Sequence, residues 1–436
     1  MTAARRVALA LLALLGAWPA SVPAQGRPLA HREVLPNGIR VLVAERPAIP
    51  IVVVQVSVPA GSIHDPADAG GLANLTAALL TRGTSRRTGP ELDRAIEFVG
   101  GTLEAEASRD ATIVSLSVLK KDLTLGLDLL SEVLRQPSFP EDELKRKAAD
   151  IQAALTRAEE NPESVGARAL AGVVFPGHGY GRPVTGTVES VGRLGRDQVR
   201  DFFGRHYRPD GAVIVAVGDV TVDEVRAAVA QRFGSWTAQG APPAAPSPPA
   251  PRPPAVVERI ARELTQATVY LGAPAVRQTD PDYFPLAVAS YLLGGASSSR
   301  LYTRVRDERG LAYSVYSYVE PARLAAAYVV GLQTRLDGVD DALRLVREEM
   351  ARMGREPVTP AELERARAYL VGSLPLRMDT TSRMAGLILA IEQNGLGLDY
   401  LDRYRKAVGR VTAADVQRVA ARYLDPAAFS TVIVGK

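Results

Sequence analysis

The sequence predicts an α+β protein made of two homologous domains, each an antiparallel β-sheet packed by α-helices. A chain of 436 residues exceeds what one hydrophobic core ordinarily holds. A proline- and alanine-rich tract, TAQGAPPAAPSPPAPRPP at 237–254, divides the chain into parts of similar length. Such a tract cannot form the interior of a helix or strand and behaves as a semi-extended linker. We therefore expect one domain at 25–236 and a second at 255–436.

The two parts also end in the same pattern, which is the third observation behind this fold class. Residues 196–218 and 413–435 each read as an amphipathic helix, a proline turn and an apolar strand that ends in glycine. A shift of 217 residues places Pro209 on Pro426 and Gly218 on Gly435. Weaker similarities in the same order relate PEDELKR (140–146) to PAELERA (360–366) and LANLTAALL (72–80) to LAVASYLLG (286–294). Chance similarity of two helix–turn–strand units remains the alternative to duplication.

The elements of the first part follow from turn residues and hydrophobic periodicity. Asn37-Gly38 between two apolar runs is a strong hairpin signal. Pro90 suits the first turn of a helix over about 90–98. The other expected elements are a strand at Ile51–Val58, a helix over about 68–82, a hairpin of Leu103–Ala107 with Thr112–Val118 around Arg109-Asp110, and helices through about 170. The second part repeats this outline, so we expect two sheets with helices on them.

The first 24 residues differ from the rest of the chain. Arg5 and Arg6 form a basic region, Val7–Trp18 an apolar region, and Val22-Pro23-Ala24 a small-residue cleavage site. This pattern predicts a secretory signal peptide at 1–24, with an apolar run too short to span a bilayer. We expect an exported protein with no stable membrane insertion.

Composition excludes several classes of function. The chain has no cysteine, which removes disulfides, thiolate catalysis and thiolate metal sites. Its formal net charge is +4, of which Arg5 and Arg6 carry two. Such a near-neutral balance gives no indication of a nucleic-acid partner.

The most informative local pattern lies in the second part, around LLGGASSSRLYTRVRDERGLAYSVYS. An apolar helix ends in the turn Gly294-Gly295-Ala296, and Ser297, Ser298 or Ser299 can cap the next helix, Arg300–Arg309. Gly310 suits the position after that helix. A strand over Leu311–Val319 would then place Tyr313, Val315 and Ser317 on one face, and Tyr316 and Tyr318 on the other.

Three blocks of this sequence resemble the pitrilysin/insulinase-like zinc metallopeptidases, specifically the two-domain branch that contains processing-type peptidases. They are GSIHDPADAGGLANLTAALLTRGT, NPESVGARALAGVVFPGHGYGRPVTGT and the Gly/Ser–Arg–Tyr block above, and the similarity spans nearly all of residues 30–436. The resemblance implies two domains that form a clam-like half-enclosure and, together with the expected export, a periplasmic location. It also implies a zinc-binding H-x-x-E-H helix, in which two histidines bind the ion and the glutamate is the general base.

This chain lacks those zinc-site residues. Aligned on GLA and RGT, the first histidine becomes Asn74, the glutamate Ala77 and the second histidine Ala78. The family's third ligand, a glutamate on a later helix, becomes Ala154. None of the four histidines lies three or four residues from another. We therefore expect no metal in this chain, and zinc in a partner subunit.

Arg306 and Tyr313 match, residue for residue, an arginine and a tyrosine with which the family holds the substrate backbone and stabilises the oxyanion. The Gly310 reversal can bring both side chains into one space. Gly294, Gly295 and Ser297–Ser299 are candidates for substrate binding, since a glycine turn permits close backbone approach, and the alternative is a plain loop. The structural alternative is an arginine paired with Asp307 or Glu308 and a tyrosine packed in the sheet.

These observations favour a non-catalytic subunit of an exported heterodimeric peptidase. An H-x-x-E-H paralogue would supply the zinc, and this chain would bind the extended peptide substrate. The alternative is a peptide-binding or structural protein with no role in catalysis. A free-standing peptidase is a third reading, but Ser297–Ser299 have no nearby residues that would activate a nucleophile.

Overall fold

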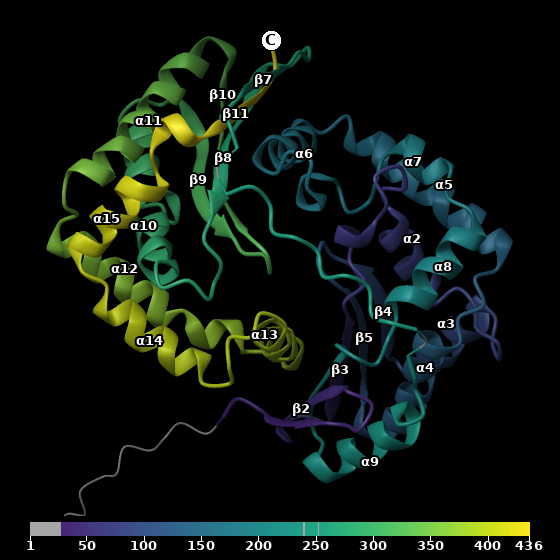
Figure 1. Cartoon of the computed structure of the whole chain (residues 1–436). Helices are drawn as coiled ribbons and strands as arrows, with labels where there is room; N and C mark the ends of the chain where they lie inside the picture. Colours follow the sequence, from purple (N-terminus) through teal and green to yellow (C-terminus); the bar gives the residue numbers. More distant parts are fainter. Residues whose placement is uncertain (1–27, 239, 252) are drawn as a thin grey trace, which may run out of the picture.

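The computed structural model describes residues 28–238, 240–251 and 253–436. The signal peptide predicted at 1–24 lies outside these residues. The described chain forms two halves, each with one β-sheet and a layer of helices on its outer face (Figure 1). No helix of the described residues is long and apolar enough to cross a membrane.

The first half contains a six-stranded sheet in the order β1-β2-β6-β3-β5-β4. Its strands are β1 (His31–Val34), β2 (Arg40–Glu45), β3 (Ile51–Val58), β4 (Thr102–Ala107), β5 (Thr112–Leu119) and β6 (Val213–Gly218). Its helices are α2 (Leu72–Leu79), α3 (Gly89–Phe98), α4 (Leu123–Arg135), α5 (Glu141–Ala158), α6 (Pro162–Val174), α7 (Val188–Gly192), α8 (Arg196–His206) and α9 (Val222–Phe233).

The second half contains a five-stranded sheet in the order β7-β11-β8-β10-β9. Its strands are β7 (Val257–Ile260), β8 (Gln266–Ala275), β9 (Ala312–Glu320), β10 (Ala326–Arg335) and β11 (Ser430–Val434). Its helices are α10 (Tyr283–Gly294), a π-helix (Tyr302–Asp307), α11 (Val339–Arg355), α12 (Pro360–Gly372), α13 (Thr381–Gln393), α14 (Tyr400–Arg410) and α15 (Ala413–Tyr423). The proline-rich linker runs between α9 and β7.

The two sheets share one topology once β1 is set aside. In each half the last strand lies between the first two, so β6 separates β2 from β3 as β11 separates β7 from β8. Neither sheet is wholly antiparallel, which corrects the prediction in this detail. The inserted last strand pairs in parallel with one neighbour, β6 with β2 and β11 with β7. A helix precedes each of these last strands, and a connection of that length permits parallel pairing.

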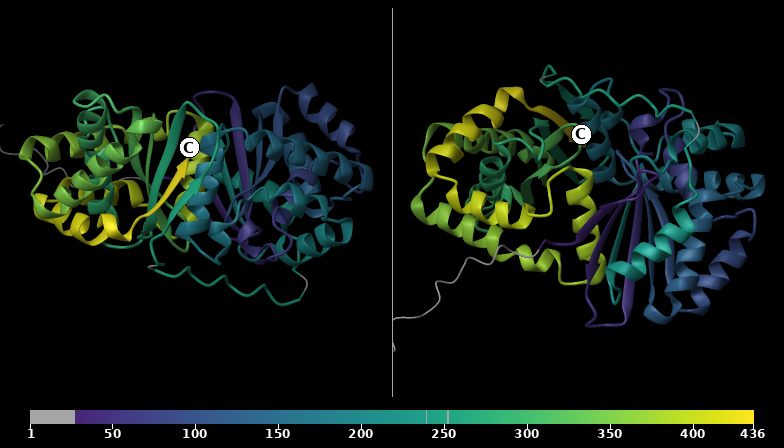
Figure 2. Two further views of the ribbon diagram at one scale, coloured as in Figure 1. Left: turned by 90° about the horizontal axis from the view of Figure 1, so that it is seen from above. Right: turned by 60° about the horizontal axis from the view of Figure 1, so that its bottom comes forward.

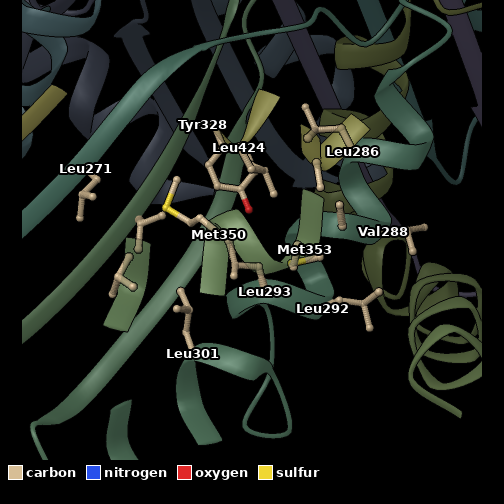
Figure 3. Close-up of a cluster of buried hydrophobic side chains, with 14 of the residues drawn as sticks. Leu271, Leu286, Val288, Leu292, Leu293, Leu301, Tyr328, Met350, Met353 and Leu424 are labelled. Atoms are coloured by element: carbon tan, nitrogen blue, oxygen red, sulfur yellow. The ribbon is translucent and has the colours of Figure 1, made fainter. Parts of the chain in front are cut away.

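Each half has its own hydrophobic core between the sheet and the outer helices. In the second half, side chains of β8, α10, α11 and α15 meet around Tyr328 (Figure 3). Met350 and Met353 of α11 and Leu292 and Leu293 of α10 belong to this core. The equivalent core of the first half joins β2, β3 and β5 to α2, α4, α8 and α9.

The inner face of each sheet is covered by a helix that the other half contributes (Figures 1 and 2). Ala385, Ile388 and Leu389 of α13 pack against Val213, Val215 and Val217 of β6, together with residues of β2 and β3. In return, Val165, Leu170 and Val174 of α6 pack against Tyr270 of β8 and Val432 of β11. The central strands β6 and β11 are therefore buried on both faces, which explains the apolar run Val213–Val217 of β6 and the apolar end Val432–Val434 of β11.

Candidate functional site

Helices α2 and α5 pack together, and they carry the positions where the resemblance expects zinc ligands. Asn74 and Ala78 lie four residues apart on the partly exposed face of α2, whereas Ala77 is buried. Ala154 is exposed on α5. One amide and three methyl groups do not form a zinc donor set, since zinc binds imidazole, thiolate or carboxylate. The residues present therefore do not fit the ion, and no cluster of three histidine, cysteine or acidic residues among the described residues replaces them.

The helix itself is nevertheless well anchored. Helix α2 begins at Leu72, later than expected, because Gly71 adopts φ +91° and Asp65 caps the helix. The backbone N–H groups of Gly71 and Ala73 each donate to the Asp65 carboxylate at 2.9 Å. Arg182 donates to the Asp65 carbonyl at 2.8 Å, so the GYGRPVTGT segment is tied to the start of α2.

Burial makes Asp65 unusual among the carboxylates of this chain. Desolvation raises its pKa to about 6, and the hydrogen bonds from Ala73 and Gly71 only partly oppose this rise. The block that resembles the family's first helix therefore keeps the residues that anchor the helix, Asp65 and Gly71, although it lacks the residues that would bind zinc.

The structure brings Arg306 and Tyr313 together in the second half. The guanidinium carbon of Arg306 lies 4.5 Å from the centre of the Tyr313 ring, which is cation–π contact. It also lies 4.6 Å from the centre of the Tyr302 ring, a contact that was not predicted. Within the described residues no carboxylate forms an ion pair with Arg306, because Glu308 pairs with Arg304 instead.

Two irregularities of the backbone produce this arrangement. The expected α-helix over Arg300–Arg309 is a π-helix at Tyr302–Asp307, in which the N–H of Glu308 donates to the carbonyl of Thr303 at 2.9 Å. Gly310 then reverses the chain with φ +59°. Helices of this kind are rare and occur frequently at functional sites.

The second irregularity lies at the start of β9 and corrects a prediction. Register with β10 runs from Ser314 opposite Gln333 to Ala312 opposite Thr334, so Tyr313 has no partner opposite it. This bulge changes the alternation of faces. Tyr313 is consequently 81% exposed, whereas Val315 and Ser317, expected on its face, are buried.

The turn Gly294–Ser299 joins α10 to this helix. Gly294 is buried against β9, where a Cβ atom would lie only 2.4 Å from the backbone nitrogen of Ser317. Ser299 is buried and its hydroxyl accepts from the N–H of Tyr302 at 3.4 Å. Gly295, Ser297 and Ser298 are exposed. The glycine at 294 thus serves packing, and the three exposed residues form the accessible part of the turn.

The histidines occupy positions that spacing along the chain did not reveal. The rings of His64 and His206 have centres 4.6 Å apart, and His206 also contacts Phe202 at 4.5 Å. Burial lowers the pKa of His206 to about 4 and lowers that of His64 too. His178 caps the turn before Tyr180. These two neutral imidazoles, tilted by 37°, link the turn Ser62–His64 to the end of α8, and no third ligand accompanies them within the described residues.

Comparison with known proteins identifies the family. Residues 40–188 match the family described as Insulinase (Peptidase family M16), and residues 193–370 match the Peptidase M16 inactive domain. The chain belongs to the insulinase-like peptidase family M16, as its sequence blocks indicated.

The relatives span nearly the whole chain. An uncharacterized zinc protease of Streptomyces coelicolor is 31% identical and covers 89% of this chain and 86% of its own length. The β subunit of the mitochondrial processing peptidase of Lentinula edodes is 28% identical over 94% of this chain and 90% of its own. A peptidase M16 inactive domain from Pseudomonas fluorescens superposes with TM-score 0.87 at 26% identity, covering 93% and 97% of the two chains. The predicted two-domain α+β fold is thereby confirmed.

Proposed function

We propose that this protein is the exported, non-catalytic subunit of a heterodimeric zinc metallopeptidase. In this proposal a paralogous subunit with an intact H-x-x-E-H helix holds the zinc and the general base. The present chain contributes Arg306 and Tyr313 to binding of an extended peptide and to stabilisation of the oxyanion. Resemblance to an M16 inactive domain and to a β subunit of a processing peptidase supports a paired arrangement.

One observation carries the proposal: the Arg306 guanidinium is held by aromatic rings and not by a carboxylate. A carboxylate partner would occupy the N–H donors of the guanidinium, whereas a ring face leaves them available. An exposed phenol and an arginine with available donors form a suitable site for a peptide carbonyl or an oxyanion. Nothing of this kind remains at Asn74, Ala77, Ala78 and Ala154.

The division of labour is chemically reasonable because metal activation of water and stabilisation of negative charge are separable contributions to one transition state. Export by the signal peptide proposed at 1–24 would place this subunit in the periplasm, where the paralogous subunit would also have to be. The exposed residues Gly295, Ser297 and Ser298 lie beside the Arg306 helix, where peptide backbone could approach.

The experiment expresses this chain alone, the H-x-x-E-H paralogue alone, and both together. Zinc content and cleavage of a quenched fluorescent peptide are measured in each preparation. We expect zinc only where the paralogue is present and full cleavage only in the mixture. Stoichiometric zinc in the lone chain, or cleavage by it, would contradict the proposal.

The contribution of Arg306 is tested in the mixture with Arg306→Ala, using Arg304→Ala as the matched control. Arg304 lies on the same π-helix but is paired with Glu308. Loss of one oxyanion donor lowers kcat by about 100- to 1000-fold. We expect this loss for Arg306→Ala with complex formation intact, and little change for Arg304→Ala. Unchanged cleavage by the Arg306→Ala mixture would favour the alternative, a peptide-binding or structural protein without a catalytic role.

A further inference from the structure

Tyr302 also contacts Arg306, and neither the motif nor the proposed function accounts for this contact. It lies four residues before Arg306 on the π-helix, and its ring centre is 4.6 Å from the guanidinium carbon. Residues four apart in a helix project to the same side, so the contact follows from the local backbone.

The two rings that contact Arg306 differ in how they are held. Tyr302 is partly buried and packs against the hydrophobic core of the second half. Its backbone N–H also donates to the buried hydroxyl of Ser299. Tyr313, by contrast, is exposed and lies at the bulge in β9. The Tyr302 ring is thus held in place by its surroundings, whereas the Tyr313 ring is accessible to a ligand.

We infer that Tyr302 is a positioning residue, which holds the Arg306 guanidinium by cation–π contact and leaves its N–H groups directed to a peptide oxygen. The inference deepens the proposed function and rests on it for the identity of the ligand. Its chemical basis is that an arginine without a carboxylate partner needs another means of restraint. An aromatic face provides restraint without using hydrogen-bond donors.

The first test measures the position of Arg306 directly in the full chain. Arginine is labelled with ¹³C and ¹⁵N, and the signals of Arg306 are assigned by their loss in Arg306→Lys. We expect an upfield ring-current shift of the Arg306 side-chain protons in the wild type. Tyr302→Phe should retain that shift, because only the ring is required, and Tyr302→Leu should reduce it.

Tyr369→Leu is the matched control, because Tyr369 is an exposed tyrosine of the same half that stacks on Tyr291. It should leave the Arg306 signals unchanged. Arg306 signals that are the same in Tyr302→Leu as in the wild type would overturn the inference. If Tyr302→Leu does not fold, as judged by circular dichroism, Tyr302→Met replaces it. The Arg306 shift should then be reduced in Tyr302→Met and retained in Tyr302→Phe, and equal shifts would overturn the inference.

The second test measures binding of fluorescein-labelled casein peptides to the full chain by anisotropy. Loss of an exposed cation–π contact corresponds to about two- to fivefold weaker binding for Tyr302→Leu, with Tyr302→Phe restoring the wild-type value. Equal weakening by Tyr302→Phe and Tyr302→Leu would contradict a role of the ring. If Arg306→Ala leaves peptide binding unchanged, the proposed function loses its binding step, whereas the resonance experiment still decides whether Tyr302 positions Arg306.

Discussion

At the scale of single residues, Arg306, Tyr302 and Tyr313 form the candidate site, in which two rings contact one guanidinium. Arg306 is in contact with two phenol rings, of which only Tyr313 is freely accessible. The hydroxyl of Tyr313 can therefore act on a ligand while its ring restrains the guanidinium. The two roles of this tyrosine can be separated by substitution.

Tyr313→Phe keeps the ring against Arg306 and removes only the hydroxyl. If the phenol donates to the oxyanion, kcat of the reconstituted complex should fall by about 10- to 100-fold with KM nearly unchanged, because the lost interaction exists only in the transition state. Steady-state kinetics on a quenched peptide measure both constants. A rise in KM with unchanged kcat would instead assign the hydroxyl to ground-state binding.

Asp65 is a second residue with a measurable property. Its carboxyl has a pKa of about 6 in the folded chain against 3.8 for the free side chain, because the folded protein buries it. The folded state therefore keeps a proton that the unfolded chain has lost, and stability from this group is present below pH 3.8 and is lost as pH rises through 6. The difference corresponds to about 3 kcal/mol.

Asp65→Asn cannot ionise but keeps one oxygen to accept from the start of α2. The free energy of unfolding of the variant minus that of the wild type should therefore rise between about pH 4 and pH 6 and stay constant above about pH 6. Urea denaturation at a series of pH values measures this difference. A difference that does not vary with pH would show that Asp65 titrates normally in the folded protein.

At the scale of elements, the exchange of α6 and α13 decides how the halves associate. Each helix leaves its own half and covers the inner face of the other half's sheet. Leu389 of α13 is 2% exposed and packs in the cluster with β6. Two residues further on, Ile391 is equally buried but packs in the core of its own half. Neighbouring residues of one helix thus stabilise different halves.

Leu389→Ala should cost about 2–5 kcal/mol, because it leaves a cavity between α13 and the first sheet. Amide hydrogen exchange should rise in β3 and β6 of the first half. Ile391→Ala should cost a similar amount but raise exchange in the second half instead. If both variants raised amide hydrogen exchange in the same half, Leu389 and Ile391 would not stabilise different halves, and the packing of α13 on the first sheet would be contradicted.

At the scale of the whole molecule, several polar contacts also join the halves, among them two at separate places. At one, the Tyr180 hydroxyl donates to Asp110 at 2.6 Å and accepts from the N–H of Leu324 in the other half at 3.1 Å. At the other, Glu392 at the end of α13 pairs with Arg32 and Arg40. Two apolar helices and these contacts make the halves one body, so the surface carrying Arg306 is held relative to α2.

Tyr180→Phe should cost about 1–3 kcal/mol, because it removes a partly buried hydrogen bond to the Asp110 carboxylate and another from the Leu324 N–H. It should also raise hydrogen exchange at the β9–β10 turn, where Leu324 lies. Tyr207→Phe is the matched control, since that buried hydroxyl donates to Thr112 within the first half. Faster exchange at this turn in both variants, or in neither, would refute a specific contribution of Tyr180 to the contact between halves.

Much of the fold follows from local chemistry and could be predicted. Asn37-Gly38 forms the predicted hairpin between β1 and β2, with Gly38 at φ +90°, because few residues other than glycine adopt that angle. The strand at Ile51–Val58 was predicted with the residues it has in the structure. The duplication was also readable, since both copies keep the same helix, turn and strand.

The candidate site was predictable only in part. The juxtaposition of Arg306 and Tyr313 was expected from the Gly310 reversal. The bulge that exposes Tyr313, however, depends on the register with Gln333 and Thr334 of β10, which no local pattern around Tyr313 indicates. The contact of Tyr302 with Arg306 was not predicted, although a spacing of four places both side chains on one side of a helix. The pairing of His64 with His206 joins residues remote in the chain, and single-sequence patterns carry no information on such remote contacts.

The sequence by itself determined that this chain has two related α+β domains, that Asn74, Ala77, Ala78 and Ala154 cannot form a zinc donor set, and where its glycine turns lie. These properties depend on side-chain chemistry and on neighbours along the chain. Only the tertiary structure decided that α6 and α13 exchange places, that Tyr313 faces outward and that aromatic rings hold Arg306. These properties depend on which surfaces remote in the chain pack together. That packing is determined by burial of apolar side chains over the whole molecule and not by any one segment.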